Sequence, residues 1–263
     1  MIALWDYDSM IYWGCYKIIT DEQIEVYKLN GKDDSFIDEE IISLSLNRLS
    51  QMETQVIEEI EDTGIVIDII EYYVTKCKFS IRKWIYPEYK PRGKDEIRRR
   101  VGLVRTRLID CGFVKYCDFF EADDIVADRA IELNEQSKDI PIHLIIGQDK
   151  DYNQIEGLRF NDSRPISKEV DNNGHRIKLP CKGLTFITKK EAEYNFWHQV
   201  LTGDSGDNIK GCEGIGKLKA TKILKGRKNL LRATYEAYLK KYKDGAKFEL
   251  WKNYFLIKLT TKR

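Results

Sequence analysis

The sequence lacks paired cysteines and has little histidine. Its six cysteines are scattered without a Cys-x-x-Cys pair, and it contains only three histidines. Structural zinc sites are built from such pairs and from histidine, so this spacing argues against one. A disulfide framework is not favoured either, because scattered thiols are typical of reduced, intracellular proteins.

Long apolar runs and a strong charge of one sign are also missing. No uninterrupted apolar stretch approaches the roughly 20 residues that cross a bilayer. The opening residues, MIALWDYD, have neither a basic leader nor an apolar signal core, so we expect an intracellular protein with no membrane partner. The net charge of +1 means that any nucleic-acid binding must come from segregated charge. Basic residues gather at 90–107, and acidic residues gather at 118–128 and 149–151.

Short apolar segments alternate with amphipathic ones in the first part of the 263-residue chain. We expect strands at 2–7, 64–75, 113–117 and 142–147. We expect helices at 36–62 and 95–110, and another that begins with ADDIVADRAIEL. This alternation predicts an α/β fold with a mostly parallel central sheet flanked by helices.

The pattern changes after residue 155. A turn signal, Asn172-Asn173-Gly174, lies between short extended pieces and predicts a hairpin. Thr188, with Glu191 three positions on, forms a capping box that begins a helix, and no later segment is typical of a strand. We therefore predict an α/β domain at 1–185 and a helical C-terminal module at 186–263.

Acidic residues follow three of the predicted strands. Because the carboxyl ends of strands in an open α/β sheet border the functional crevice, these side chains should meet at one edge. A glycine-rich segment further along, GDSGDNIKGCEGIGKLKA, adds two more. The candidate metal ligands are Asp6, Glu121, Asp123, Asp124, Asp149, Asp151, Asp204 and Asp207.

Carboxylates this close raise one another's pKa, and bound divalent cations remove the conflict. Oxygen ligands without a histidine cluster favour Mg²⁺ or Mn²⁺. Two such ions about 3.5–4 Å apart can activate a water and stabilise the departing oxygen of a phosphodiester. Each segment also has an ordinary structural explanation, as a turn former, a favourable helix start or a loop. Asp128, one turn after Asp124, is interpreted as a solvated acid or as a support for the ligands.

Glycines and lysines define a second candidate site. Gly211, Gly214 and Gly216 form a turn that leads into a helix from about Lys217. Glycine lets the backbone approach a ligand closely, and the N–H groups of a helix start favour an anion. We expect a DNA phosphate here, with charge added by Lys217, Lys219 and Lys222. The alternative is an ordinary turn between two packed helices.

A third segment, SIRKWIYPEYKPRGKDEIRRR (80–100), mixes cations with aromatics. Lysine and arginine neutralise phosphates, and aromatic rings stack on unpaired bases, at about 1–3 kcal/mol per base. A solvated, charged loop and helix face is the alternative. The candidate DNA-binding residues are Arg82, Tyr89, Lys90, Arg92 and Lys94, together with Gly211, Gly214, Gly216, Lys217 and Lys219.

Five motifs occur in a characteristic order: WDYD, FSIRKWIYPEYK, EADDIVAD, GQDKDYNQI and LTGDSGDNIKGCEGIGKLKATKIL. Over nearly the whole chain, this order resembles the structure-specific 5′ nucleases. That family comprises flap endonucleases and 5′→3′ exonucleases, including the 5′-nuclease domain of bacterial DNA polymerase I and stand-alone bacteriophage enzymes. The resemblance implies a PIN-like or resolvase-like fold. It also implies a helix–three-turn–helix that grips duplex DNA with help from a potassium ion.

The resemblance also implies roles for single residues. The acids named above would hold two Mg²⁺ or Mn²⁺ ions. Lys90 would be the arch lysine that reaches the scissile phosphate, with Arg82 as a second basic contact and Tyr89 near the unpaired base. Asp6, Asp124 and Asp149 would share in catalysis, and the Gly211–Gly216 turn would cradle phosphate and potassium.

The sequence departs from the family pattern at two places. Relatives often carry an acid where Thr75 stands. PRGK follows Lys90, and either Arg92 or Lys94 could take the place of the family's arginine there.

The resemblance implies a metal-dependent 5′→3′ exonuclease or 5′-flap endonuclease that hydrolyses DNA by a two-metal mechanism. Its substrate would carry a 5′ flap or a recessed or nicked duplex end. We expect a monomer in the cytoplasm of a bacterial or phage-infected cell, active in replication and repair. Two alternatives stay open: a PIN-type or RNase H-like ribonuclease that removes RNA primers, and a structure-specific DNA-binding protein that does not cut. PIN toxins lack the glycine-rich module, and a non-cutting protein predicts missing acids.

Overall fold

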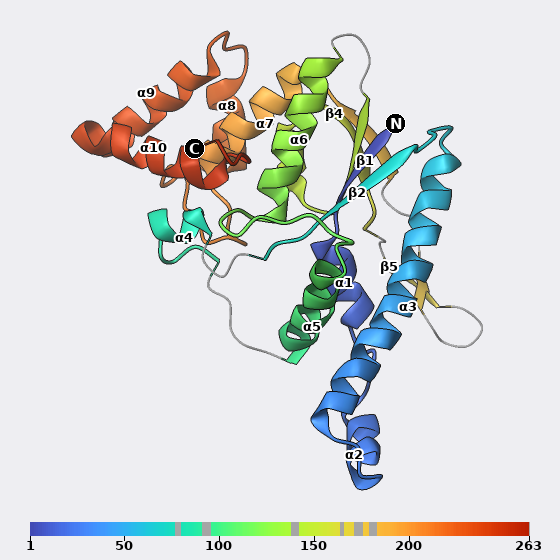
Figure 1. Ribbon diagram of the computed structural model, residues 1–263. Coiled ribbons are helices and arrows are strands. Elements are labelled where there is room, and N and C mark those ends of the chain that lie inside the picture. Colours follow the sequence, from blue (N-terminus) through green and yellow to red (C-terminus); the bar gives the residue numbers. More distant parts are fainter. Residues whose placement is uncertain are drawn as a thin grey trace.

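The computed structural model describes residues 1–76, 80–90, 96–137, 142–163, 166–170, 176–178 and 183–262. Figure 1 shows a central sheet with helices on both faces and a group of helices formed by the C-terminal part of the chain. The strands are β1 (Ile2–Asp6), β2 (Ile69–Tyr73), β3 (His143–Ile146), β4 (Gly157–Asn161), β5 (Ile166–Val170), β6 (Arg176–Lys178) and β7 (Gly183–Ile187). The α-helices are α1 (Asp8–Cys15), α2 (Asp21–Leu29), α3 (Asp34–Glu61), α4 (Ile81–Ile85), α5 (Glu96–Asp110), α6 (Ala122–Gln136), α7 (Lys189–Thr202), α8 (Lys217–Leu224), α9 (Leu230–Tyr242) and α10 (Ala246–Ile257). Two 3₁₀ turns complete them, η1 (Lys150–Gln154) and η2 (Lys243–Gly245).

The central sheet has five strands in the order β2-β1-β3-β4-β7. The pairings β1–β2, β1–β3 and β3–β4 are parallel, and only β4–β7 is antiparallel. The predicted α/β fold with a mostly parallel sheet is therefore confirmed. β4 and β7 were not among the expected strands, because a buried arginine interrupts the apolar pattern of β4 and half-exposed side chains line β7.

The strand predicted at 113–117 is wrong. This segment makes a single parallel bridge, from Lys115 to Tyr73. Phe113 and Tyr116 are 45% and 40% exposed, so the aromatic side chains that suggested a buried strand lie largely at the surface. The neighbouring prediction at 64–75 is correct for the shorter stretch that forms β2.

The sheet is covered by different helices on its two faces (Figure 1). On one face, Trp5, Ile146 and Phe160 pack in a core with residues of α1, α3 and α5. On the other face, Leu4 and Ile145 pack against the apolar side of α6. Because β1 and β3 are covered on both faces, their central residues are apolar and buried, as expected of a buried parallel sheet.

The C-terminal helices enclose a separate apolar cluster. Phe196, Val200, Leu224, Tyr238 and Leu256 belong to it. The capping box is present, since Thr188 accepts a hydrogen bond from the Glu191 N–H and the Glu191 carboxylate accepts one from the Thr188 N–H. Within the described residues no strand follows β7. The division into two domains near residue 185 stays a prediction.

The predicted hairpin is confirmed as the antiparallel pair β5–β6, although its turn, Asn172–Gly174, lies outside the described residues. Among the helices that the structure describes, none is both long and apolar enough to span a membrane.

Candidate active site

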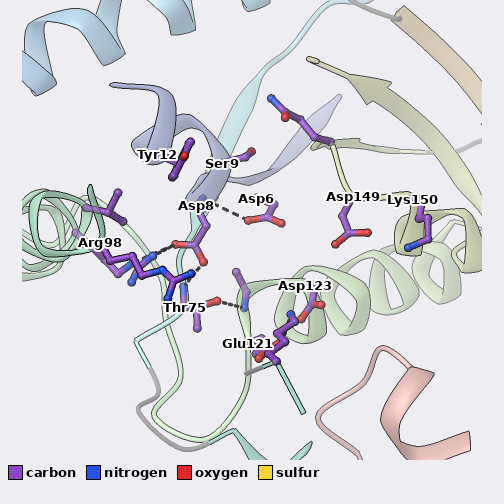
Figure 2. Close-up of a pocket in the computed structure, with 15 residues that line it drawn as sticks. Asp6, Asp8, Ser9, Tyr12, Thr75, Arg98, Glu121, Asp123, Asp149 and Lys150 are labelled. Carbon is purple, nitrogen blue, oxygen red and sulfur yellow. Dashed lines mark hydrogen bonds and ion pairs between the residues drawn. The ribbon is translucent and has the colours of Figure 1, made fainter. Parts of the chain in front are cut away.

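A pocket of about 770 Å³ opens at the carboxyl edge of the sheet. Asp6 ends β1, Asp149 follows β3, and Glu121 and Asp123 lie at the start of α6. Figure 2 shows Asp6, Asp123 and Asp149 arranged around this one space. The structure thus brings together acids from three separate chain segments, two at strand ends as expected and one at the start of α6, and Lys90 lines the same pocket. Its other lining residues are Asp8, Ser9, Tyr12, Thr75, Arg98, Val101, Arg105, Ala122, Gln148 and Lys150.

The remaining predicted acids lie beside or behind the pocket. Asp151, Asp204 and Asp207 adjoin it without lining it. Asp124 is buried, with 1% exposure, and its Oδ1 accepts hydrogen bonds from Arg82 (2.7 Å) and from the Thr260 N–H (3.0 Å). Asp124 therefore supports the pocket from behind and does not line it.

Arg82 joins the acids at the start of α6. Its guanidinium lies 2.9 Å from Glu121 Oε2, 3.5 Å from Asp123 Oδ1 and 2.7 Å from Asp124 Oδ1. Only 2% of its side chain is exposed, and it does not line the pocket. Arg82 thus neutralises the three neighbouring carboxylates and holds them together, whereas the sequence predicted a contact with DNA.

Lys90 and Tyr89 bridge two acidic segments. The Lys90 ammonium donates to Glu121 Oε2 at 2.7 Å and lies 3.5 Å from Asp207 Oδ2. The Tyr89 hydroxyl lies 2.9 Å and 3.1 Å from the same two oxygens. Burial alone would raise the pKa of Glu121, but Lys90 and then Arg82 hold it at about 2. The Tyr89 ring is 1% exposed and packs in the C-terminal cluster, so it presents no free face for stacking on a base.

Asp6 is held by a tyrosine. The Tyr152 hydroxyl donates to Asp6 Oδ2 at 2.9 Å, and the Asp8 N–H donates to Oδ1 at 3.3 Å. Burial, followed by repulsion from Asp8 and Asp123, raises the pKa of Asp6 well above its usual value. A bound cation would relieve this repulsion.

Asp8 and Thr75 form a link that the sequence analysis missed. Asp8 Oδ1 pairs with Arg105 at 2.9 Å, and Asp8 Oδ2 accepts the Thr75 N–H at 3.0 Å. Thr75 Oγ1 in turn accepts the Ala122 N–H at 2.9 Å, while Glu121, at the N-cap of α6, makes no side-chain cap (Figure 2). Thr75 therefore caps the helix that carries the acids. The second aspartate of WDYD was the available signal for Asp8, but nothing in the sequence singled out Arg105.

A further group of polar side chains joins η1 to the glycine-rich turn. Gln199 Nε2 donates to Asp151 Oδ1 at 2.7 Å and to Asp204 Oδ2 at 3.3 Å. The Lys150 ammonium pairs with Asp204 and lies 3.7 Å from Asp151 Oδ1. Burial and then Asp149 raise the pKa of Asp151 to about 7. Burial would also raise the pKa of Asp204, but its pair with Lys150 lowers it.

The glycine-rich turn is closed by tight backbone contacts. A Cβ on Gly211, whose φ is +65°, would lie 2.3 Å from the Gly203 nitrogen, so only glycine fits there. The buried Asn253 side chain accepts the Gly211 N–H at 3.0 Å. Beyond the turn, four of the predicted DNA-binding residues are exposed: Gly214, Gly216, Lys217 and Lys219. Arg92 and Lys94 lie outside the described residues.

Of the two sequence interpretations of Asp128, burial contradicts the solvated acid and is compatible with a support for the ligands. Asp128 is 8% exposed, and its carboxylate accepts hydrogen bonds from the Thr260 hydroxyl (2.8 Å) and the Thr261 N–H (2.9 Å). It fastens the C-terminal end of the described chain to α6, close to Asp124.

The donor chemistry of the pocket fits Mg²⁺ or Mn²⁺, because every candidate ligand is a carboxylate oxygen. In the part of the chain that the structure describes, no group of three or more aspartate, glutamate, histidine or cysteine side chains is close enough to hold a metal. The acids instead pair with cations of the protein: Arg82 and Lys90 with Glu121, and Lys150 with Asp204. A divalent ion would have to compete with these cations.

No protein-family model matches the chain. The chain is 27% identical over 187 residues to a protein named 5′-3′ exonuclease from Aquifex aeolicus, across 68% of this chain and 61% of that relative. It is 24% identical over 152 residues to a protein named flap endonuclease Xni from a Shewanella species, across 56% of this chain and 53% of that one. It also matches 17% of a DNA polymerase I from Caldicellulosiruptor bescii, at 27% identity. The chain therefore spans less than two thirds of the length of these relatives.

Two solved structures share the fold over nearly the whole chain. One is the bacteriophage T5 flap endonuclease in a pseudo-enzyme-product complex with DNA and metal ions, with a TM-score of 0.59, 15% identity, and 99% of this chain and 89% of that one covered. The other is the T5 5′-exonuclease with bound zinc ions, with a TM-score of 0.58, 16% identity, and 99% and 90% covered.

The sheet order and the helical C-terminal region thus belong to a PIN-like fold. Among proteins of that fold, the chain is related in sequence to 5′-3′ exonucleases, flap endonucleases and DNA polymerase I. The resemblance to the structure-specific 5′ nucleases is confirmed.

Proposed function

We propose that the protein is a metal-dependent 5′ nuclease that hydrolyses DNA phosphodiester bonds, as a 5′→3′ exonuclease and 5′-flap endonuclease. The observation that carries the proposal is the convergence of Asp6, Glu121, Asp123 and Asp149 on one pocket that also contains Lys90. The names of the sequence relatives support the same activity.

Two divalent ions, Mg²⁺ or Mn²⁺, would be held by Asp6, Glu121, Asp123 and Asp149, and by Asp151, Asp204 and Asp207 beside them. When bound, such ions supply an activated water and stabilise the leaving oxygen. Asp124 and Arg82 act from behind by holding the start of α6 in place.

Lys90 is the cation best placed to meet the scissile phosphate. Its ammonium lies at the pocket, and an ammonium stabilises the negative charge that develops on a phosphoryl group. Tyr152 keeps Asp6 oriented, and Thr75 keeps the start of α6 oriented. Phosphodiester hydrolysis would thus depend on acidic side chains that these hydrogen bonds hold in a fixed orientation.

The substrate would be DNA with a 5′ flap or with a recessed or nicked end. Arg98 and Arg105 of α5 and Tyr12 of α1 line the pocket and suit a single-stranded 5′ end, and Arg92 and Lys94 would add to this basic arch. The duplex would lie against the turn at Gly211–Gly216, with Lys217 and Lys219 on its phosphates and a K⁺ ion at the turn. The protein would act as a monomer, with two domains divided near residue 185. It would work in the cytoplasm of a bacterial or phage-infected cell.

A 5′-labelled flap substrate tests this function. With Mg²⁺ the protein should release labelled product, EDTA should abolish release, and Asp149→Asn should stop turnover while preserving DNA binding. Asp110→Asn, which changes an exposed aspartate at the end of α5, is the matched control and should cut normally. Undiminished cleavage by the Asp149 variant would refute the site.

The same assay separates the alternatives. Preferential cleavage of a matched RNA flap would indicate a ribonuclease. Metal-independent binding without turnover would indicate a DNA-binding protein. Product length distinguishes stepwise exonuclease action from endonucleolytic release of the flap.

A further inference from the structure

We propose that Lys150 is a displaceable counter-cation, which neutralises Asp204 and Asp151 in the metal-free protein and withdraws when a divalent ion binds beside them. The inference rests on the proposed metal-dependent function, since it concerns how a divalent ion binds beside Asp204 and Asp151. It gives Lys150 a role in setting the metal affinity of the site.

Lys150 lies where a divalent ion could replace its ammonium. Its ammonium pairs with Asp204, from the glycine-rich turn, and lies 3.7 Å from Asp151, from η1. Gln199 Nε2 donates to the same two carboxylates from α7. A single positive charge therefore lies where acids from two distant chain segments meet, and those acids would otherwise repel each other.

The exposure of the three side chains indicates which one can move. Lys150 is 65% exposed, whereas the side chains of Asp151 and Asp204 are 11% and 8% exposed. The aspartates are fixed, because Asp151 is held by Gln199 and Asp204 accepts the Gly206 N–H at 2.8 Å. Because the Lys150 side chain is mostly exposed, its ammonium can return to water directly, and a divalent ion in its place would compensate the two buried aspartates.

Lys90 provides an internal comparison. It also bridges two acidic segments, but its side chain is only 14% exposed. Its backbone N–H is bonded to the Asp207 carbonyl at 3.1 Å, and its φ of +43° lies in the left-handed region. Lys90 is therefore held in place from several sides, as a residue that acts on the substrate should be, whereas most of the Lys150 side chain is exposed.

Exchange of Lys150 for a divalent ion follows from simple electrostatics. An ion of charge +2 between Asp151 and Asp204 gains more from both carboxylates than an ammonium does, and it repels the ammonium. The lysine thus keeps the acids compatible before metal binds, and it lowers the apparent affinity for the metal by competing for the same oxygens.

Calorimetric titration of Mn²⁺ into the DNA-free protein tests the competition. Lys150→Met should bind Mn²⁺ beside Asp151 and Asp204 about 3- to 10-fold more tightly than the parent protein, because one competing positive charge is gone. Lys115→Met is the matched control: Lys115 is 57% exposed, pairs with the 11%-exposed Glu71 at 3.0 Å and lies outside the pocket lining. It should bind Mn²⁺ with the affinity of the parent.

The possible results separate the two proposals. Unchanged or weaker Mn²⁺ binding by Lys150→Met, with normal binding by the parent, would overturn the role of Lys150 and leave the nuclease proposal standing. No Mn²⁺ uptake by the parent would overturn both.

A second measurement uses the unmodified protein and does not depend on how a variant folds. Acylation of lysine amines by an N-hydroxysuccinimide ester, followed residue by residue by mass spectrometry, reports on whether each ammonium is paired. Adding Mn²⁺ should speed the acylation of Lys150 about 2- to 5-fold and leave Lys115 unchanged, since only Lys150 would lose its partner. An unchanged rate at Lys150 under Mn²⁺ saturation would refute displacement.

Discussion

Replacing Arg82 with methionine should destabilise the protein strongly, because its guanidinium pairs with three largely buried carboxylates. The guanidinium is 2% exposed, and its partners Glu121, Asp123 and Asp124 are 12%, 12% and 1% exposed. Methionine fills similar space but carries no charge, so the substitution leaves buried negative charges without their main counter-ion.

The expected size of this effect follows from the burial. Removing one partner of a buried ion pair typically costs about 3–5 kcal/mol of unfolding free energy. Arg232 is the matched control, since it pairs with Glu236 at 3.1 Å but is 79% exposed. For such an exposed pair one helical turn apart, Arg232→Met should cost at most about 0.5 kcal/mol.

Urea unfolding at pH 7 and low ionic strength measures both variants without any DNA or metal. Adding Asp124→Asn to Arg82→Met should recover part of the loss, because the double variant has one fewer uncompensated charge. If Arg82→Met costs no more than Arg232→Met, the view of Arg82 as the buried organiser of the acids is wrong.

Three further predictions concern single residues. Burial lowers the pKa of His143 from 6.5 to about 4. Between these two pH values the unfolded chain therefore binds a proton that the folded protein does not bind. Stability should therefore fall as the pH drops from 6.5 towards 4, by about 3 kcal/mol in total, and urea unfolding of His143→Leu across that range should lack this part of the slope. Tyr152→Phe removes the hydrogen bond to Asp6 and should weaken Mn²⁺ binding several-fold by calorimetry; equal affinity would contradict an orienting role. Gly211→Ala should unfold at a markedly lower urea concentration than the parent, because its Cβ would collide with the Gly203 backbone. Gly226→Ala is the control: it also has a positive φ, of +71°, but open space around its Cβ, so its unfolding midpoint should fall only by the effect of backbone strain.

The local sequence was enough to predict most elements near the site. The apolar run ending at Asp6, the helix beginning at Ala122 and the capping box at Thr188 all have short-range signals, and all are present. The strand expected at 113–117 failed because its apolar and aromatic residues are as compatible with a half-exposed loop as with a strand, and only pairing partners decide between them.

The residues of the site were also predictable only in part. Strand-end placement predicted correctly that Asp6 and Asp149 would share one edge, since parallel strands deliver their carboxyl ends together. Asp123 lies at the same edge, but it comes from the start of α6 and not from a strand end. Strand-end placement could not predict which acids line the pocket and which lie behind it. Asp124 and Asp128 follow the same helix start as Asp123, but their rotation around α6 turns them towards Arg82 and the Thr260–Thr261 segment.

By itself, then, the sequence determined the kinds of elements and the acidic chemistry at the strand ends, because hydrophobic periodicity, caps and turn residues act over a few neighbours. Only the tertiary structure decided the partner of each charge. Thr75 meets Ala122 across 47 positions, and Lys150 meets Asp204 across 54. Contacts over such separations depend on how the whole chain packs, and here they determine which carboxylates pair with cations of the protein itself.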